Sequence, residues 1–275
     1  MNNLVKKSIV FILIVIVLLA GINIFMGVKT TGDKEYESDI ISEHNAKVLE
    51  IEDERIANLS DNDDKMATVK IKNISKLNIS QIVLYYDEAD KSDSVISDSK
   101  LDIDITLSSD EVVRMEFTPK DYTETIEITG YTYLVEDTKV YVNLKNDEVN
   151  ILENKEYLDN SKNYEVMSIN KIDGDKNNTT DSALNIEIKN ISEKNLGNIV
   201  LRIAEINEDQ EIVKIDHIVY NSILKPDEEA QISATLYDPN YSIKILGYTY
   251  DDMENKSNID IDLITHKVNI VESKQ

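Results

Sequence analysis

Apolar and polar residues alternate along most of the chain beyond residue 28. In residues 67–72 and 184–189 every second side chain is apolar, and its neighbours are polar. Successive side chains of a β-strand point to opposite faces, so this period of two predicts strands with one buried and one hydrated face. Polar turns, such as 61–64 and 88–91, separate these runs. Short alternating strands between polar turns are typical of an antiparallel β-sandwich.

The same pattern occurs twice. Residues 69–75 read VKIKNIS and residues 186–192 read IEIKNIS, at an offset of 186 − 69 = 117. The sequence GYTY at residues 130–133 recurs at residues 247–250 with the same offset. A repeat of this length indicates duplication of a whole domain, because the repeats of solenoid proteins are much shorter.

One long apolar segment, residues 8–28, precedes the repeats, and Asn23 is its only strongly polar interruption. About 20 apolar residues rising 1.5 Å each would cross a hydrocarbon core of roughly 30 Å. Lys6 and Lys7 precede the segment and acidic residues follow it, which predicts a single-pass signal-anchor with its N-terminus in the cytoplasm. The alternative is a cleaved signal peptide, although no small-x-small site follows the core Ile9–Ile22. Under either interpretation the bulk of the chain is outside the cytoplasm, and it is secreted if cleavage occurs.

The sequence therefore predicts an all-β fold of two tandem immunoglobulin-like antiparallel β-sandwiches after an N-terminal transmembrane helix. The expected parts are a cytoplasmic N-terminus (1–7), a transmembrane anchor (8–28), an acidic stalk (29–45), sandwich repeat 1 (46–153), a linker (154–163) and sandwich repeat 2 (164–275).

Charge and composition exclude several classes of function. A net charge of −24 repels phosphate backbones, so we expect no nucleic acid partner. The absence of cysteine excludes disulfides, thiolate zinc sites and cysteine nucleophiles. His44, His217 and His266 do not recur between the repeats, and the chain has no glycine-rich phosphate loop. We therefore expect no catalytic site, no cofactor and no enzymatic activity. The richness in isoleucine, asparagine and lysine is typical of low-GC Gram-positive bacteria.

The motifs at the ends of the repeated strands resemble a known family. A strand ending in Lys-Asn-Ile-Ser occurs in both repeats, and the turn at residues 224–228 reads LKPDE. These features are similar to FxLYD-like immunoglobulin-like modules of Gram-positive envelope proteins, in which a Leu-x-Pro-Gly-Glu turn is typical. Here Asp227 replaces the glycine, and the corresponding turn at residues 107–111 lacks the proline. The resemblance implies a fold and an envelope location but no active site.

The repeated tyrosines are the candidate ligand contacts. Tyr131 and Tyr133 share one face of their predicted strand, as do Tyr248 and Tyr250. Exposed tyrosines in this arrangement stack on sugar rings or hold peptides. Aromatic residues two positions apart on a strand also serve as ordinary packing, and the preceding glycine then allows a bulge or a close backbone approach. Both interpretations are open at this point.

Acidic loops before the Lys-Asn-Ile-Ser strands are candidates for calcium binding. They contain Asp61 and Asp63 in the first repeat and Asp173 and Asp175 in the second. Calcium takes six to eight oxygen ligands, but neither loop has the EF-hand pattern, so the alternative is a solvated turn.

Asn73 and Asn190 fall on the inward phase of their strands. We expect each side chain to cap the following turn by hydrogen bonding to the backbone, rather than to contact a ligand.

These observations predict a membrane-anchored, extracytoplasmic, non-enzymatic binding protein of a bacterial cell envelope. Its partner is an unidentified envelope protein or a wall polymer. The alternatives are a passive structural spacer, an accessory subunit of a membrane complex, and a calcium-dependent adhesin. The exposure of Tyr131 and Tyr248 distinguishes binding from spacing, since buried rings favour a spacer.

Overall fold

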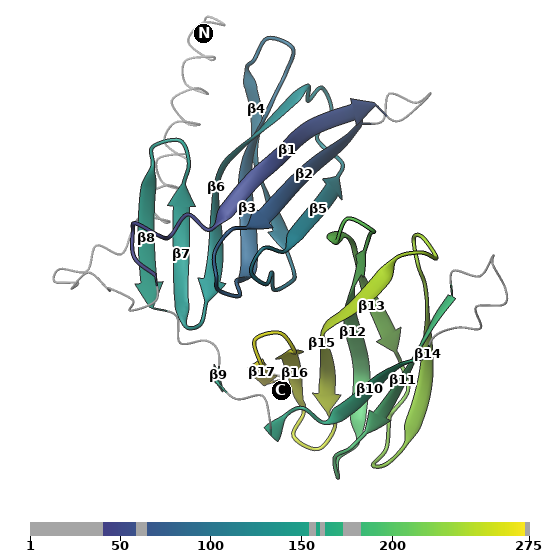
Figure 1. The fold of residues 1–275 in the computed structure, drawn as a ribbon. Helices are drawn as coiled ribbons and strands as arrows, with labels where there is room; N and C mark the ends of the chain where they lie inside the picture. Colours follow the sequence, from purple (N-terminus) through teal and green to yellow (C-terminus); the bar gives the residue numbers. More distant parts are fainter. Residues whose placement is uncertain (1–40, 59–64, 154–157, 160–162, 173–182, 273–275) are drawn as a thin grey trace, which may run out of the picture. The chain divides into compact units, whose positions relative to one another are not determined.

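The computed structural model describes residues 41–58, 65–153, 158–159, 163–172 and 183–272. Within these ranges the regular structure consists of β-strands without an α-helix (Figure 1), as the alternating pattern predicted. None of the residues in these ranges forms a helix that is long and apolar enough to span a membrane. The predicted anchor at 8–28 lies outside the described residues.

The first half of the described chain, residues 41–153, contains the strands β1-β2-β5, which form one end of a nine-stranded sheet, and a five-stranded sheet β4-β3-β6-β7-β8. Figure 1 shows the strands of these sheets lying over one another, and side chains from both sheets share one hydrophobic core. The strands are β1 (Leu49–Asn58), β2 (Lys65–Asn73), β3 (Ser80–Ala89), β4 (Val95–Ile103), β5 (Val112–Phe117), β6 (Thr125–Val135), β7 (Thr138–Asn143) and β8 (Glu148–Glu153).

The second half, residues 163–272, has the same order of strands in a sheet β10-β11-β14 and a run β13-β12-β15-β16-β17. A two-residue strand, β9 (Leu158–Asp159), pairs with β17. The other strands are β10 (Met167–Ile172), β11 (Ala183–Asn190), β12 (Leu196–Ile206), β13 (Glu211–Tyr220), β14 (Glu229–Thr235), β15 (Ser242–Asp252), β16 (Ser257–Asp262) and β17 (Lys267–Glu272).

The burial of side chains follows the alternation seen in the sequence. In β3, Ile82, Leu84 and Tyr86 are buried and alternate with partly exposed neighbours. Residues 130–135 of β6 differ, because all of them are buried. Successive side chains point to opposite faces, so both faces of this segment are covered, and a strand covered on both faces loses the period-two pattern.

A β-bulge lies directly before the glycine of each GYTY sequence, on the same strand. Tyr85 pairs with Gly130 and Tyr86 pairs with Ile128, so Thr129 is the extra residue of β6. A Cβ atom on Gly130 would lie 2.7 Å from the carbonyl oxygen of Val142. The second half repeats this bulge at Leu246. The expected close backbone approach at these glycines is therefore confirmed.

The equivalent turns before β5 and β14 have the same backbone strain. Asp110 has φ 62° and Asp227 has φ 60°. This left-handed region favours glycine, and aspartate and asparagine tolerate it better than most other residues. Aspartate therefore occupies the turn position at which Leu-x-Pro-Gly-Glu sequences carry glycine.

The two halves meet where β5 pairs in parallel with β13. This pairing, Glu211 with Val112 and Ile212 with Val113, extends one sheet through both halves in the order β1-β2-β5-β13-β12-β15-β16-β17-β9. We call this pairing and the side-chain contacts around it the junction. Ala204, Ile212 and Leu246 of the second half are buried in the hydrophobic cluster of the first half.

Candidate functional site

The structure places the four candidate ligand tyrosines in the interior. Tyr131, Tyr133, Tyr248 and Tyr250 are at most 1% exposed. Within each pair the ring centroids are 6.1 Å apart. A ligand would have to open the hydrophobic core to reach these rings. Their burial therefore favours the packing interpretation over ligand contact.

Hydrogen bonds and electrostatics fit a structural role for these tyrosines. The hydroxyl of Tyr133 donates to the carbonyl oxygen of Ala46 at 2.8 Å, and the hydroxyl of Tyr250 donates to the carbonyl oxygen of Tyr164 at 3.1 Å. Burial raises the pKa of Tyr131 to about 12, because a phenolate would be poorly solvated there. These tyrosines therefore fasten the segment before the first strand of each half to the core.

Asn73 and Asn190 cap their turns, as expected from the sequence. The Asn73 side-chain oxygen accepts hydrogen bonds from the Ser75 backbone NH at 3.0 Å and the Ser75 hydroxyl at 2.7 Å. Its amide donates to the Leu77 and Leu107 carbonyl oxygens at 2.8 and 3.0 Å. Asn190 makes the corresponding bonds in the second half.

The sequence pattern did not predict that two carboxylates are buried. Glu88 and Glu205 are at equivalent positions, 205 − 88 = 117 residues apart, and both side chains are buried. Glu88 accepts hydrogen bonds from the backbone NH of Lys120 and the hydroxyl of Thr123, both at 2.7 Å. Glu205 accepts the backbone NH of Tyr237 at 2.7 Å. Their recurrence at the repeat offset of 117, on an inward strand position in both halves, could have identified these glutamates from the sequence.

The buried glutamates hold the loops before β6 and β15, and only the second of these loops carries a stacked tyrosine pair, in which one ring is exposed and the other is partly buried. Tyr237 is 75% exposed, and its ring stacks against that of Tyr241 at a centroid distance of 6.3 Å and an interplanar angle of 23°. Lys120 and Glu124 occupy the equivalent positions in the first half, since 237 − 117 = 120 and 241 − 117 = 124. We call Tyr237 and Tyr241 the tyrosine platform.

The loop of the tyrosine platform is fixed by its own polar residues. Asp238 accepts hydrogen bonds from the backbone and the side-chain amide of Asn240 at 2.8 and 3.0 Å. Desolvation raises the pKa of Tyr241, and the negative charge of Asp238 raises it further. A raised pKa keeps the Tyr241 ring uncharged at physiological pH.

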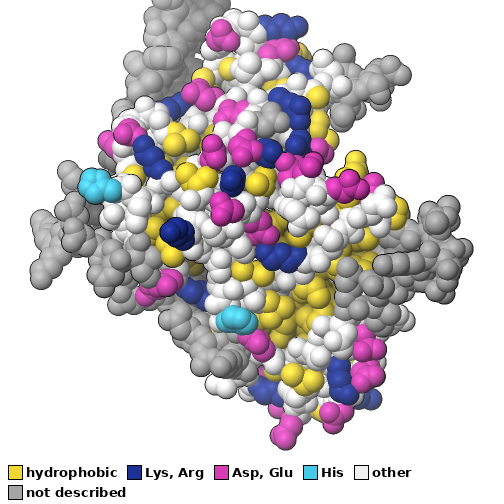
Figure 2. Space-filling view, viewed as in Figure 1, with side chains coloured by type: hydrophobic (Ala, Val, Ile, Leu, Met, Phe, Trp, Pro, Cys, Tyr) yellow, Lys and Arg dark blue, Asp and Glu magenta, His cyan; other side chains and the backbone are white. Residues whose placement is uncertain are grey.

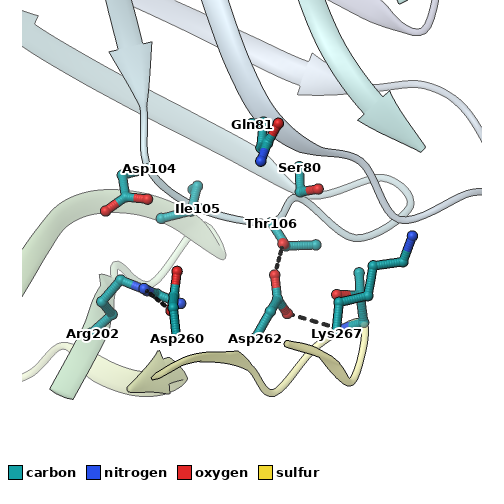
Figure 3. Close-up of a pocket in the computed structure, with 10 residues that line it drawn as sticks. Ser80, Gln81, Asp104, Ile105, Thr106, Arg202, Asp260, Asp262 and Lys267 are labelled. Carbon is teal, nitrogen blue, oxygen red and sulfur yellow. Dashed lines mark hydrogen bonds and ion pairs between the residues drawn. The ribbon is translucent and has the colours of Figure 1, made fainter. Parts of the chain in front are cut away.

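A small polar pocket of about 60 Å³ is lined by residues from both halves (Figure 3). Arg202 donates to Asp260 at 2.6 Å and to the carbonyl oxygen of Ile261 at 3.2 Å. Burial raises the pKa of Asp260, and the positive charge of Arg202 opposes this shift. On the other side of the pocket, the hydroxyl of Thr106 donates to Asp262.

The size and chemistry of this pocket suit water rather than an organic ligand. A volume of about 60 Å³ holds a few water molecules, since one water needs about 10–15 Å³ of such space. The buried Lys267 Nζ has no hydrogen-bond partner among the described residues and lies at the edge of the pocket (Figure 3). A water molecule that bonds Lys267 would satisfy this cation.

The described ranges contain few arrangements of histidine and acidic side chains that suit metal binding or acid–base catalysis. No group of three or more histidine or acidic residues there could hold a metal ion. His217 lies 3.3 Å from Asp104 and His266 lies 3.0 Å from Glu165, at exposed histidine positions. The calcium candidates Asp61, Asp63, Asp173 and Asp175 lie outside the described residues.

Acidic and basic side chains are mixed on the surface despite the net charge of −24. Figure 2 shows lysine and arginine among aspartate and glutamate on one face. Ion pairs account for part of this mixing, such as Lys145 with Asp87 and Lys189 with Glu229. Exposed pairs of this kind each contribute about 0–1 kcal/mol to stability.

Comparison with known proteins gave neither a matching family model nor a matching curated protein. A crystal structure of red sea bream transglutaminase is 10% identical with a TM-score of 0.23; the match covers 83% of this chain and 32% of that one. A chaperone–tip adhesin complex of CFA/I fimbriae is 16% identical, with a TM-score of 0.17 and coverages of 66% and 86%. A structure titled pT26-6p is 7% identical, with a TM-score of 0.19 and coverages of 74% and 58%. The chain thus spans about a third of the length of the transglutaminase, and likenesses this weak say nothing about activity or partners.

Proposed function

We propose that this chain is a membrane-anchored, extracytoplasmic, non-enzymatic binding protein of a Gram-positive cell envelope. In this proposal residues 8–28 anchor two tandem immunoglobulin-like domains outside the membrane, and the tyrosine platform contacts a neutral wall glycan. The observation that carries the proposal is the stacked pair Tyr237–Tyr241, in which Tyr237 is exposed and Tyr241 is partly exposed, and which the first half lacks.

Physical chemistry favours a sugar polymer as the ligand of this platform. The faces of sugar rings carry C–H groups that pack on aromatic rings, and tyrosine adds a hydroxyl that forms hydrogen bonds with sugar hydroxyls. The buried carboxylate of Glu205 holds the backbone of Tyr237 in place before any ligand arrives. A fixed platform loses little conformational entropy on binding.

Charge narrows the choice among wall polymers. The net charge of −24 disfavours phosphate-rich anionic polymers, which the protein repels at moderate salt. A neutral glycan strand meets no such barrier. The glycan is therefore a better candidate than an anionic wall polymer.

Co-sedimentation of the purified full chain with isolated cell-wall glycan tests this function. We expect Tyr237→Ala/Tyr241→Ala to weaken binding at least tenfold, because two stacking contacts are removed. Tyr122→Ala is the matched control, since Tyr122 is 83% exposed but has no stacking partner among the described rings. Equal retention of wild type and the double variant would remove the platform from the proposal.

A structural spacer or accessory subunit is the second candidate, and a specific observation favours it. The four repeated tyrosines are buried, and this burial was the outcome expected for a spacer. A chain that binds neither glycan nor envelope proteins, but whose shortening shifts the position of a membrane complex, would support this role over binding.

Membrane topology can be tested separately from binding. Protease added to wall-stripped cells is expected to remove the residues beyond about 45, while a cytoplasmic control protein survives. Protection of the whole chain would contradict the proposed orientation, and release of the chain into the medium would support cleavage of the N-terminal segment.

A further inference from the structure

The junction joins one strand edge of the first half to one strand edge of the second half. Because the two halves are repeats, each of these two strands also has an equivalent strand in the other half. The first half contributes β5 and the second half contributes β13. The repeat equivalent of β13 is β4, at the end of the five-stranded sheet, and the equivalent of β5 is β14, at the end of the three-stranded sheet. We call β4 and β14 the outer edges. In the described part of the chain, β4 pairs only with β3, and β14 pairs only with β11.

The outer edges have the same backbone register as the junction edges. Ala89 pairs with Val95 after a register shift, and Ile206 pairs with Ile212 after the same shift. Both members of the second pair follow those of the first by 117 residues. On the other side, Lys70 pairs with Arg114 and Glu187 pairs with Gln231, again at this offset. The strands β14 of one chain and β4 of another therefore have the backbone geometry for the parallel pairing seen at the junction.

Such pairing between chains would be head-to-tail. A contact that uses two different surfaces does not close on itself unless the rotation forms a ring, so it adds chains without a fixed limit. Unpaired strand edges are the usual route to such growth, and natural proteins protect them with charge or polar residues. The side chains at the outer edges decide whether this route is open.

Ion pairs support the junction. Glu211 lies 2.6 Å from Lys70 and 3.4 Å from Arg114, and Lys244 lies 2.7 Å from Glu111. These side chains are largely shielded from solvent, with exposures of 12–27%. Partly buried pairs of this kind are screened less by salt than fully exposed ones.

The equivalent positions at the outer edges cannot form these ion pairs. Ser94 replaces Glu211, and Glu187 replaces Lys70. Glu127 replaces Lys244, whereas Glu228 retains the acidic character of Glu111. Head-to-tail docking would thus place Glu127 against Glu228, in the arrangement that Lys244 and Glu111 have at the junction. Two like charges in contact oppose association.

Apolar contacts are removed at the outer edge β4 as well. At the junction, Ala204 and Leu246 are buried in the first half's core, and Ile215 packs against it. Their equivalents on the first half are Asp87, Thr129 and Asp98, each 117 residues earlier. Val95, the equivalent of the buried Ile212, is 60% exposed. The first half therefore presents a polar surface where the second half presents an apolar one, as terminal repeats of stacked arrays do.

We propose that the outer edges are a disabled copy of the junction, and that the partner they exclude is a second copy of this chain. The charge and polarity of Ser94, Glu127 and Glu187 prevent head-to-tail association of one chain with another. Restoring the junction residues at the outer edges will convert the protein into a self-associating one.

The test uses the full chain in one detergent and measures association by analytical ultracentrifugation. A β4-edge variant and a β14-edge variant are made separately and combined. A control variant with the same change in net charge carries its substitutions on exposed turns away from both edges. The substitutions are Ser94→Glu/Glu127→Lys for the β4 edge, Glu187→Lys/Gln231→Arg for the β14 edge, and Glu136→Lys/Glu193→Lys for the control.

We expect wild type and control to be monomers. A mixture of the two single-edge variants should stop at a heterodimer, since each chain has one restored edge. The combined variant should form longer oligomers, with an apparent dissociation constant at least tenfold below that of the control. A second combined variant, with Asp98→Ile and Thr129→Leu added, should associate more tightly because it also restores the apolar contacts.

Cross-linking reports whether the contact is the expected one. The chain has no cysteine, so Val95→Cys on one chain and Ala230→Cys on another form a specific pair at the positions equivalent to Ile212 and Val113. A disulfide between these positions in the restored variants supports the proposal. The proposal is overturned if folded restored variants remain as monomeric as the control, or if wild type already associates and forms this cross-link.

Discussion

Replacing Asn190 with alanine is expected to destabilise the second half strongly. Four hydrogen bonds of the Asn190 side chain are lost, to Lys194, Leu224 and twice to Ser192, at distances of 2.7–3.0 Å. A net value of about 1 kcal/mol for each bond gives a loss of roughly 4 kcal/mol. Water can restore the bonds of Ser192, which is partly exposed, so the expected loss falls to about 2–4 kcal/mol.

Urea unfolding of residues 37–275, followed by circular dichroism, measures this loss. Asn195→Ala is the matched control: Asn195 is exposed, so its substitution should change the free energy of unfolding by less than about 0.5 kcal/mol. The midpoint for Asn190→Ala should fall without a change in slope for the affected transition. A loss below about 1 kcal/mol, or equal losses for both variants, would refute the view that this side chain holds the turn.

Three further outcomes are expected. Burial alone would raise the pKa of Asp252, but the Lys194 ammonium at 2.6 Å and backbone NH groups outweigh burial and lower this pKa to about 2. The folded state should therefore lose stability as the pH falls from about 4 to 2, and Asp252→Asn should remove this loss in acid-unfolding curves. Sodium and calcium at matched ionic strength should raise the melting temperature equally, because screening relieves carboxylate repulsion; a rise that saturates at low calcium and disappears in Asp173→Asn/Asp175→Asn would show a specific site. Each half expressed alone should give a β-type circular dichroism spectrum, and a helical spectrum would contradict the all-β fold of the halves. The first half alone should melt at a lower temperature than in the whole chain, because Ile212 of the second half no longer covers its core.

The strands were predictable because a half-buried sheet imposes a period of two on the sequence. The alternation of Ile82, Leu84 and Tyr86 reports burial directly. The all-β class follows from many such runs. The duplication then made Asn73 and Asn190 recognisable as turn caps, since the same polar residue recurred on an inward position in both halves.

Other features depend on contacts between distant parts of the sequence. The burial of Tyr131 was ambiguous, because two tyrosines two positions apart on a strand can serve either as packing or as an exposed ligand surface. Glu88 was predicted to lie in a polar turn at 88–91, and this was wrong. It ends the inward face of β3, where Lys120 and Thr123 satisfy its carboxylate. Only the folded loop reveals these partners.

The junction was also beyond the sequence pattern. Glu211 and Lys70 are 141 residues apart, and nothing in their local sequence identifies them as partners. The pairing of β5 with β13 depends on the shapes of both folded halves. The tyrosine platform was missed for a related reason, because Tyr237 and Tyr241 do not recur in the equivalent loop of the first half and their stacking depends on how the loop folds.

The short pairing at the junction has a mechanical consequence. β5 and β13 share two residue pairs, whereas β6 and β7 share six. Backbone pairing therefore resists separation of the two halves less than it resists separation of β6 from β7. A load applied across the junction acts mainly against the buried side chains Ala204, Ile212 and Leu246 and the ion pairs of Glu211, so these side chains determine the mechanical strength of the contact between the halves.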